Sequence, residues 1–166
     1  CLYCNPSLSS SIEKENKKFG EFKQEGVDLG FQVEIVDRQA KDFIPLFWKW
    51  FPEGFPKVKR FHILGGEPLL QKEFDKLLDM IEQYPNKDCE LNVVSNLMLP
   101  TDRLESYINK VKKLVASRKI RRFDISCSID CWGPEQEYVR YGLDLEQWQR
   151  NFERLLKEKW IYLNIN

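Results

Sequence analysis

The sequence of 166 residues has no excess of charge of either sign. Lys and Arg together number 26, Asp and Glu together number 26, and the formal net charge at pH 7 is 0. Proteins that bind nucleic acid through its phosphates usually carry a basic surface, so this composition gives no support for such a partner. Only a local basic patch would keep that alternative open.

Long apolar runs and a secretory signal are also missing. No stretch approaches the roughly 20 apolar residues of a membrane-spanning helix, so we expect no membrane partner. The five cysteines are an odd number, which argues against a disulfide scaffold. A reducing cytoplasm, with some cysteines in metal-binding or redox use, fits this pattern better.

The chain has enough apolar residues, 42%, for one domain with a sizeable core. Stretches of strand character alternate with stretches of helical spacing. Strands are expected at 61–64, 91–96, 123–130 and 161–166, and helices at 70–84, 101–115 and 144–156. Thr101 is expected to cap the second of these helices, and Asp144 with Gln147 the third. This alternation predicts an α/β fold with a parallel sheet or barrel.

The first sixty residues are less informative. Residues 7–30 are polar and predict a solvated helix or loop. The alternating apolar residues of 31–36 weakly indicate an extended segment. A helix is expected around residues 43–51, with Asp37 as a cap and Pro45 in its first turns or at a kink.

A carboxylate in a glycine turn follows the expected strand at 61–64. The turn is Gly65-Gly66-Glu67-Pro68, and parallel α/β folds bind ligands at the carboxyl ends of their strands. Glycine lacks Cβ, so the backbone of Gly65 and Gly66 can approach a ligand closely. Without other features, an ordinary strand-to-helix turn would be the better interpretation.

The expected strand at 123–130 has one apolar and one polar face. Its polar row ends in Ser128 and Asp130, whereas a buried parallel strand is usually apolar on both faces. We expect this row to face a barrel interior and Cys127 to pack against helices. The preceding basic run, 118–122, is expected to be a solvated helix end. Arg140 is either a surface cation or a fork for a carboxylate near the strand ends.

The sequence opens on Cys1-Leu2-Tyr3-Cys4, a Cys-x-x-Cys motif that allows three interpretations. The first is a thioredoxin-like redox pair, for which Asn5 and Pro6 are a poor helix start. The second is a zinc site completed by Cys127 and Cys131, which an extended strand would hold about 13 Å apart. The third is a set of iron–sulfur ligands that lacks its first member.

Taken together, Cys1-x-x-Cys4 with Tyr3 between, the Gly65–Pro68 turn and Ser128-Ile129-Asp130 resemble the radical S-adenosylmethionine (SAM) superfamily. The family pattern is Cys-x3-Cys-x2-Cys, and Cys1 and Cys4 match its second and third cysteines. The first would lie four residues before Cys1, outside this sequence. Residues 137–142 and the Trp-bearing helix after them further resemble members with a twitch domain.

The resemblance implies a fold and a cofactor set. Residues 1–166 would be one incomplete core domain, a partial (βα)6 TIM-like barrel of parallel strands that is truncated at both ends. Cys1 and Cys4 would hold a 4Fe-4S cluster with the missing cysteine. Reductive cleavage of SAM would then give a 5′-deoxyadenosyl radical that abstracts hydrogen from a peptide or small-molecule substrate. An electron donor such as flavodoxin or ferredoxin would be a partner.

The resemblance also assigns roles to the candidate residues. Glu67 and the backbone of Gly65 and Gly66 would bind the methionine amine of SAM. Its carboxylate would be bound by Arg140 and Ser128, its ribose by Asp130 or Asn96, and Tyr3 would border the adenine. Two rival interpretations stay open: an activase that installs a glycyl radical on a partner protein, and a non-catalytic metal or redox module that uses only Cys1 and Cys4.

Overall fold

The computed structural model describes residues 10–20 and 33–166. The chain divides into two compact units, residues 1–49 and residues 50–166. The first contains helix α1 (Ser10–Phe19), and helix α2 (Val33–Gly54) contains the division. The prediction of a single core domain over residues 1–166 stays a prediction. Cys1, Tyr3 and Cys4 lie outside the described residues.

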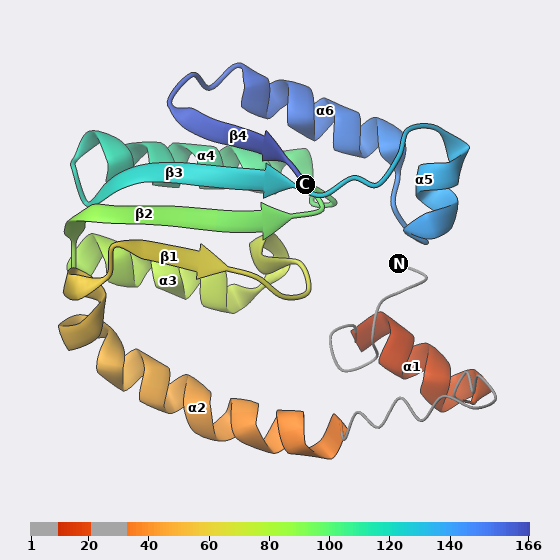
Figure 1. The fold of residues 1–166 in the computed structure, drawn as a ribbon, viewed down its shortest axis with the longest axis horizontal. Helices are drawn as coiled ribbons and strands as arrows, with labels where there is room; N and C mark the ends of the chain where they lie inside the picture. The colour runs from red at the N-terminus through yellow and green to blue at the C-terminus, as the bar shows by residue number, and fades with distance from the viewer. Residues whose placement is uncertain (1–9, 21–32) are drawn as a thin grey trace. The chain divides into compact units, whose positions relative to one another are not determined.

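The second unit is built on a four-stranded sheet in which all strands are parallel (Figure 1). The strands are β1 (Arg60–Ile63), β2 (Asn86–Ser95), β3 (Ile120–Cys127) and β4 (Ile161–Ile165), and they lie in the order of the chain. This order and the parallel directions confirm the α/β prediction. A helical connection leads from each strand to the next one along the sheet. Such connections between parallel strands are almost always right-handed.

Three helices connect the strands: α3 (Lys72–Gln83), α4 (Thr101–Ala116) and α6 (Leu145–Leu156). The short 3-10 helices η2 (Phe55–Lys57) and η3 (Pro68–Leu70) flank β1, and α5 (Pro134–Val139) follows β3. Figure 1 shows α3 and α4 on one side of the sheet, with α6 beside β4. The predicted helical spacing is confirmed at most apolar positions, which are buried: Phe74, Leu77, Leu78, Ile81, Leu104, Ile108, Val111, Leu114, Trp148 and Leu155. Leu70 and Leu156, at the ends of the expected helices, are exposed instead.

The two faces of the sheet differ in chemistry. Phe61, Leu91, Phe123 and Ile161 form one row in register, and Ile63, Val93, Ile125 and Leu163 form the next. The members of these rows on β2 and β3, with Ile161, belong to the core, and the strand residues between the rows are mostly polar, among them Glu90, Asn92 and Asp124. One face of the sheet is therefore apolar and packed on helices, and the other is a polar surface.

Strand β3 begins and ends earlier than the sequence predicts. It spans Ile120–Cys127, so Ser128 and Asp130 lie in the loop after it. Arg121 and Arg122 belong to the strand and not to a solvated helix end: the backbone of β3 pairs with β2 from Ile120 on, and both guanidinium groups form ion pairs with Glu90 on β2. The buried position predicted for Cys127 is confirmed.

Three other local predictions are wrong. Residues 33–36 are helical and not extended, since a short alternation of apolar residues also fits the start of a helix. Asp37 lies inside α2 and not before its first residue; Pro45 lies near the middle of that helix and not in its first turns, and a kink at Pro45 stays a prediction. Thr101 is the first residue of α4 and does not cap it; its hydroxyl donates to Asn151 Oδ1 at 3.3 Å. The cap at Asp144 is confirmed by the bond from the Gln147 amide at 2.9 Å.

Over residues 10–20 and 33–166, no helix has both the length and the apolar character required to span a membrane.

Candidate functional site

The loops that follow β1, β2 and β3 carry most of the residues that the sequence singles out. Because parallel strands end at one edge of a sheet, these loops are neighbours, with the loop after β2 in the middle. The candidate residues found there are Gly65, Gly66, Glu67, Asn96, Ser128 and Asp130.

The loop after β1 requires a glycine at its first turn. Gly65 has a φ of 111°, which L side chains rarely adopt. An added Cβ would meet nothing within 4 Å, so the requirement is conformational and not steric. Gly65 and Gly66 are both exposed, so their backbone groups are accessible to a ligand.

Glu67 is buried and joins two loops. Its Oε1 accepts hydrogen bonds from the Ser95 hydroxyl at 2.8 Å and the Leu69 amide at 3.2 Å. Its Oε2 accepts from the Asn96 amide at 2.8 Å. The carboxylate thereby caps the 3-10 helix η3 and fixes the turn after β1 to the end of β2.

All three of these donors are neutral. Burial raises the pKa of Glu67 above its ordinary value, and the bonds from Asn96, Ser95 and Leu69 oppose that rise. In the part of the chain that the structure describes, no ion pair involves Glu67. A carboxylate of this kind can still attract a cationic ligand group, because its charge is solvated by dipoles and not neutralised.

The loop after β2 turns tightly around Asn96. The Asn96 Oδ1 accepts a bond from the Met98 amide at 2.8 Å, and the Ser95 hydroxyl accepts one from the Leu97 amide at 2.9 Å. Leu97 adopts a positive φ of 55° between them and is fully buried. The predicted ribose contact of Asn96 stays a prediction; its carbonyl oxygen already serves the turn.

Ser128 connects the loop after β3 to the end of β2. Its amide donates to the Ser95 carbonyl at 2.8 Å, which extends the sheet pairing one residue beyond β3. The side chain of Ser128 is buried, with 9% exposure of the residue. Ser128 is therefore bonded to Ser95, the residue whose hydroxyl donates to Glu67.

Asp130 and Arg140 form a two-pronged ion pair. Arg140 Nη2 donates to Asp130 Oδ1 at 3.1 Å, and Arg140 Nε donates to Oδ2. Arg140 is the residue that ends α5, ten positions after Asp130. The sequence left open whether Arg140 is a surface cation or a fork for a carboxylate; it forms a fork, and the carboxylate that it binds within this chain is that of Asp130.

Two of the residues that build the site were missed by the sequence reasoning. The first is Ser95, whose hydroxyl donates to Glu67. The only signal for this role in the sequence is its position at the end of an expected strand. Gln136 is fully buried in α5, and its Oε1 accepts from the amides of Asp130 and Cys131, both at 3.0 Å. Nothing in the local sequence distinguishes this glutamine from a surface residue.

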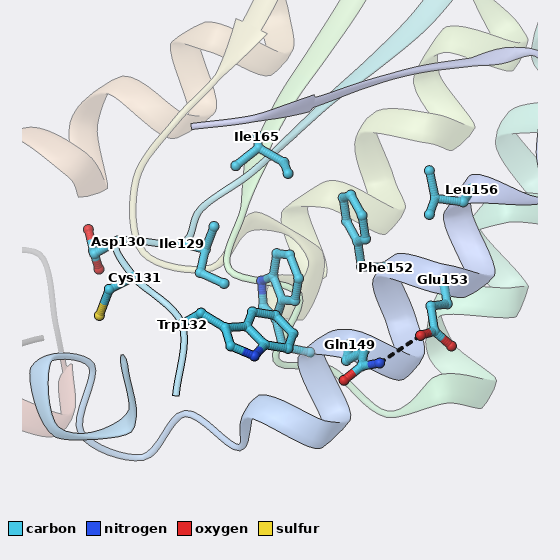
Figure 2. A pocket seen from close by; sticks show the side chains of 10 residues that line it. Ile129, Asp130, Cys131, Trp132, Gln149, Phe152, Glu153, Leu156 and Ile165 are labelled. Atoms are coloured by element: carbon cyan, nitrogen blue, oxygen red, sulfur yellow. Dashed lines mark hydrogen bonds between the residues drawn. The ribbon is translucent and has the colours of Figure 1, made fainter. Parts of the chain in front are cut away.

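A groove of about 560 Å³ lies between α6 and the ends of β3 and β4. Figure 2 shows that Ile129, Trp132, Phe152 and Ile165 line it, with Asp130 and Cys131 away from these rings. Trp132 packs edge-on against Trp148, which stacks on Phe152. The groove is apolar and belongs to the helix-covered side of the sheet, so it is distinct in character from the Glu67 cluster.

No set of three His, Cys, Asp or Glu side chains able to hold a metal occurs within residues 10–20 and 33–166. Cys89 and Cys127 are buried free thiols, and Cys131 is exposed. The predicted ligands Cys1 and Cys4 and the predicted adenine contact Tyr3 lie in the part that is not described.

Comparisons of this chain with protein-family models, with curated proteins and with solved structures give no match.

Proposed function

We propose that this chain is part of a radical SAM enzyme whose SAM site lies at the carboxyl edge of the sheet. The observation that supports this most is the meeting of Glu67, Asn96 and Ser128 around Ser95, beside the loop that carries the Asp130–Arg140 pair. Four predicted residues from three separate stretches of sequence thereby lie at one edge. On this proposal the sheet is part of a (βα)6 TIM-like barrel and its polar face lines the interior.

The donor set at this edge fits SAM in chemical terms. Glu67 and the exposed backbone of Gly65 and Gly66 would bind the methionine ammonium, which needs acceptors and a negative charge. Arg140 and Ser128 would bind the methionine carboxylate, and Asp130 or Asn96 the ribose hydroxyls. The roles of Cys1 and Cys4 as ligands of a 4Fe-4S cluster, and of Tyr3 beside the adenine, rest on the sequence resemblance alone.

When bound, the cluster and SAM would supply one-electron chemistry for removing hydrogen from a peptide or small-molecule substrate. This chain's own residues hold and orient the cofactor. Glu67 stays in place because three donors bind it, and Arg140 binds the carboxylate of Asp130. An electron donor such as flavodoxin or ferredoxin would complete the reaction.

SAM binding by the protein with its complete cysteine motif tests the proposal. The protein is reconstituted with iron and sulfide without oxygen, and SAM is titrated while the EPR signal of the reduced cluster is followed. We expect Glu67→Ala and Asp130→Ala to weaken SAM binding roughly tenfold to a hundredfold, the effect of losing a hydrogen bond to a charged group. Iron content should not change in either variant, and Cys4→Ala should abolish it.

Glu53→Ala is the matched control, because Glu53 is an exposed carboxylate near the end of α2. It should change neither SAM affinity nor iron content. If SAM affinity were unchanged in both the Glu67 and Asp130 variants, the proposed site would be wrong. Zinc bound through Cys1 and Cys4, with no response to SAM, would instead favour a non-catalytic metal module.

A further inference from the structure

The short helix α5 buries a polar side chain and no apolar one. Gln136 is 0% exposed, whereas Glu135, Glu137 and Tyr138 of the same helix are exposed. A helix usually packs through apolar residues, and glutamine is seldom fully buried. What Gln136 contributes must therefore lie in its hydrogen bonds and not in apolar packing.

The side-chain carbonyl oxygen of Gln136 binds the backbone of the loop after β3. Its Oε1 accepts from the amides of Asp130 and Cys131, each at 3.0 Å. Because both partners are N–H donors, the side-chain amide atom that faces them must be the oxygen and not the nitrogen. The Gln136 Nε2 has no hydrogen-bond acceptor among the residues described.

The same helix also binds the side chain of Asp130. The backbone amide of Arg140 donates to the backbone carbonyl oxygen of Gln136 at 2.9 Å, so Arg140 lies one helical turn after Gln136. Arg140 then binds both carboxylate oxygens of Asp130. Asp130 is consequently held at two points, its amide by Gln136 and its carboxylate by Arg140.

The ion pair alone would not fix the loop. The side chain of Asp130 is 35% exposed, and ion pairs that reach solvent hold long side chains only weakly. Gln136 itself is fully buried, so the two bonds that its Oε1 accepts supply the geometric constraint that the ion pair lacks.

We infer that Gln136 is a positioning residue: it fixes the backbone at Asp130 so that the carboxylate meets Arg140 and is presented to the ligand at the sheet edge. This inference rests on the proposed function for its ligand, SAM. The contact between Gln136 and the loop, and its effect on the ion pair, can be tested without any ligand.

Two substitutions separate the hydrogen bonds from side-chain volume. Gln136→Met keeps the length of the side chain and removes the acceptor. Gln136→Glu keeps an acceptor for both amides. It removes no hydrogen bond, because the Nε2 group that it replaces has no acceptor among the residues described. Asn86→Leu is the matched control: Asn86 is also a buried amide with two bonds to a loop, to the Phe55 and Val58 carbonyls at 2.7 Å, but it lies at the amino end of β2.

The first measurement uses this 166-residue chain and NMR. In Gln136→Met we expect the amide protons of Asp130 and Cys131 to exchange at least about tenfold faster with solvent, and the Arg140 Nε–H resonance to move toward its position in free arginine. Gln136→Glu should restore both properties, and Asn86→Leu should change neither. An Arg140 resonance that does not move in Gln136→Met would overturn the inference.

The second measurement is SAM affinity in the reconstituted protein with its complete cysteine motif. Gln136→Met should raise the Kd for SAM about tenfold at unchanged iron content, and Gln136→Glu should return it to within about threefold of the original. Asn86→Leu should lower the melting temperature and leave the Kd unchanged; an equal loss of affinity in that control would mean that Gln136 acts only through stability. If the unsubstituted protein bound no SAM, the proposed function would fail, while the NMR result would still decide the role of Gln136.

Discussion

Two buried glutamates lie on this sheet in opposite electrostatic situations. Glu90, on the polar face of β2, forms ion pairs with Arg60, Arg121 and Arg122 at 3.0, 3.3 and 3.2 Å. Glu67, in the loop after β1, accepts its three hydrogen bonds from two backbone amides and a hydroxyl. One carboxylate is neutralised by neighbouring strands, and the other is held without neutralisation.

The pKa values of the two groups move in opposite directions. The hydrogen bond from Arg60, followed by the charges of Arg122, Arg60 and Arg121, holds the pKa of Glu90 below its ordinary value despite partial burial. Burial raises the pKa of Glu67, because its neutral donors compensate only part of the lost hydration. The charged form of Glu90 is therefore stabilised by three arginines, whereas the charged form of Glu67 has only neutral donors and would be stabilised further by a cationic group.

The largest expected effect is on stability when Glu67 loses its oxygens. Glu67→Leu leaves the Leu69 amide, the Asn96 amide and the Ser95 hydroxyl without their acceptor in a buried setting. We expect the free energy of unfolding to fall by about 3 kcal/mol, measured by urea denaturation. A loss below about 1 kcal/mol would show that water reaches these donors and that Glu67 is not the link between the two loops.

Because the two pKa shifts have opposite signs, Glu67 and Glu90 should make the free energy of unfolding change with pH in opposite directions. Because the pKa of Glu67 is raised in the folded state, its contribution to stability is present at low pH and is lost as the pH rises above about 4.5. Because the pKa of Glu90 is lowered, its contribution is present above about 4.5 and is lost as the pH falls below that value.

Urea unfolding from about pH 3 to about pH 7 measures this in Glu67→Gln and Glu90→Gln. With rising pH, the stability of the original protein relative to Glu67→Gln should decrease, and relative to Glu90→Gln it should increase. Equal slopes in the two variants would contradict the assignment of the two electrostatic environments.

The smallest expected effect is on the buried thiol of Cys127, whose pKa responds to the charge of Glu67, with the buried thiol of Cys89 as the comparison. Burial, and then the charge of Glu67, raises the pKa of Cys127 to about 12. Burial raises the pKa of Cys89 to about 11, where the charge of Glu90 is a minor contribution. Glu67→Gln should therefore raise the alkylation rate of Cys127 about twofold at alkaline pH and leave Cys89 unchanged.

Mass spectrometry of the alkylated peptides gives both rates in one sample. The exposed Cys131 serves as the internal reference for reagent activity, since its thiol is accessible without unfolding. A larger rate increase at Cys89 than at Cys127 on going from the original protein to Glu67→Gln would place the charge of Glu67 elsewhere than beside Cys127.

The sequence was sufficient for the order of the strands and for most of the helices. Alternating apolar spacing located β1 to β4, and sequential right-handed crossovers leave little choice of order once strands and helices alternate. The ends of elements were harder, because they depend on partners distant in sequence. Strand β3 starts at Ile120 because its backbone pairs there with Asn86 of β2, and the next two residues, Arg121 and Arg122, form ion pairs with Glu90 of β2.

At the candidate site, residue type and strand end indicated Glu67, Asn96, Ser128 and Asp130, but not what holds them. The bond from Ser95 to Glu67 spans 28 positions, so no local pattern contains it. The burial of Gln136 likewise results from the path of the loop after β3. Local propensity cannot indicate it, since glutamine at that position of a short helix is equally suited to solvent.

The strand order has a consequence for how this chain folds. Among the described residues, each strand of the unit pairs with its neighbours in the sequence and with no other strand. Contacts of this kind have short separations along the chain for a parallel sheet, so the entropy lost in closing each loop stays small. A completed pair such as β1 and β2 with α3 can serve as the template on which the next strand and helix assemble, so folding can proceed as growth from one edge of the sheet in the direction of synthesis.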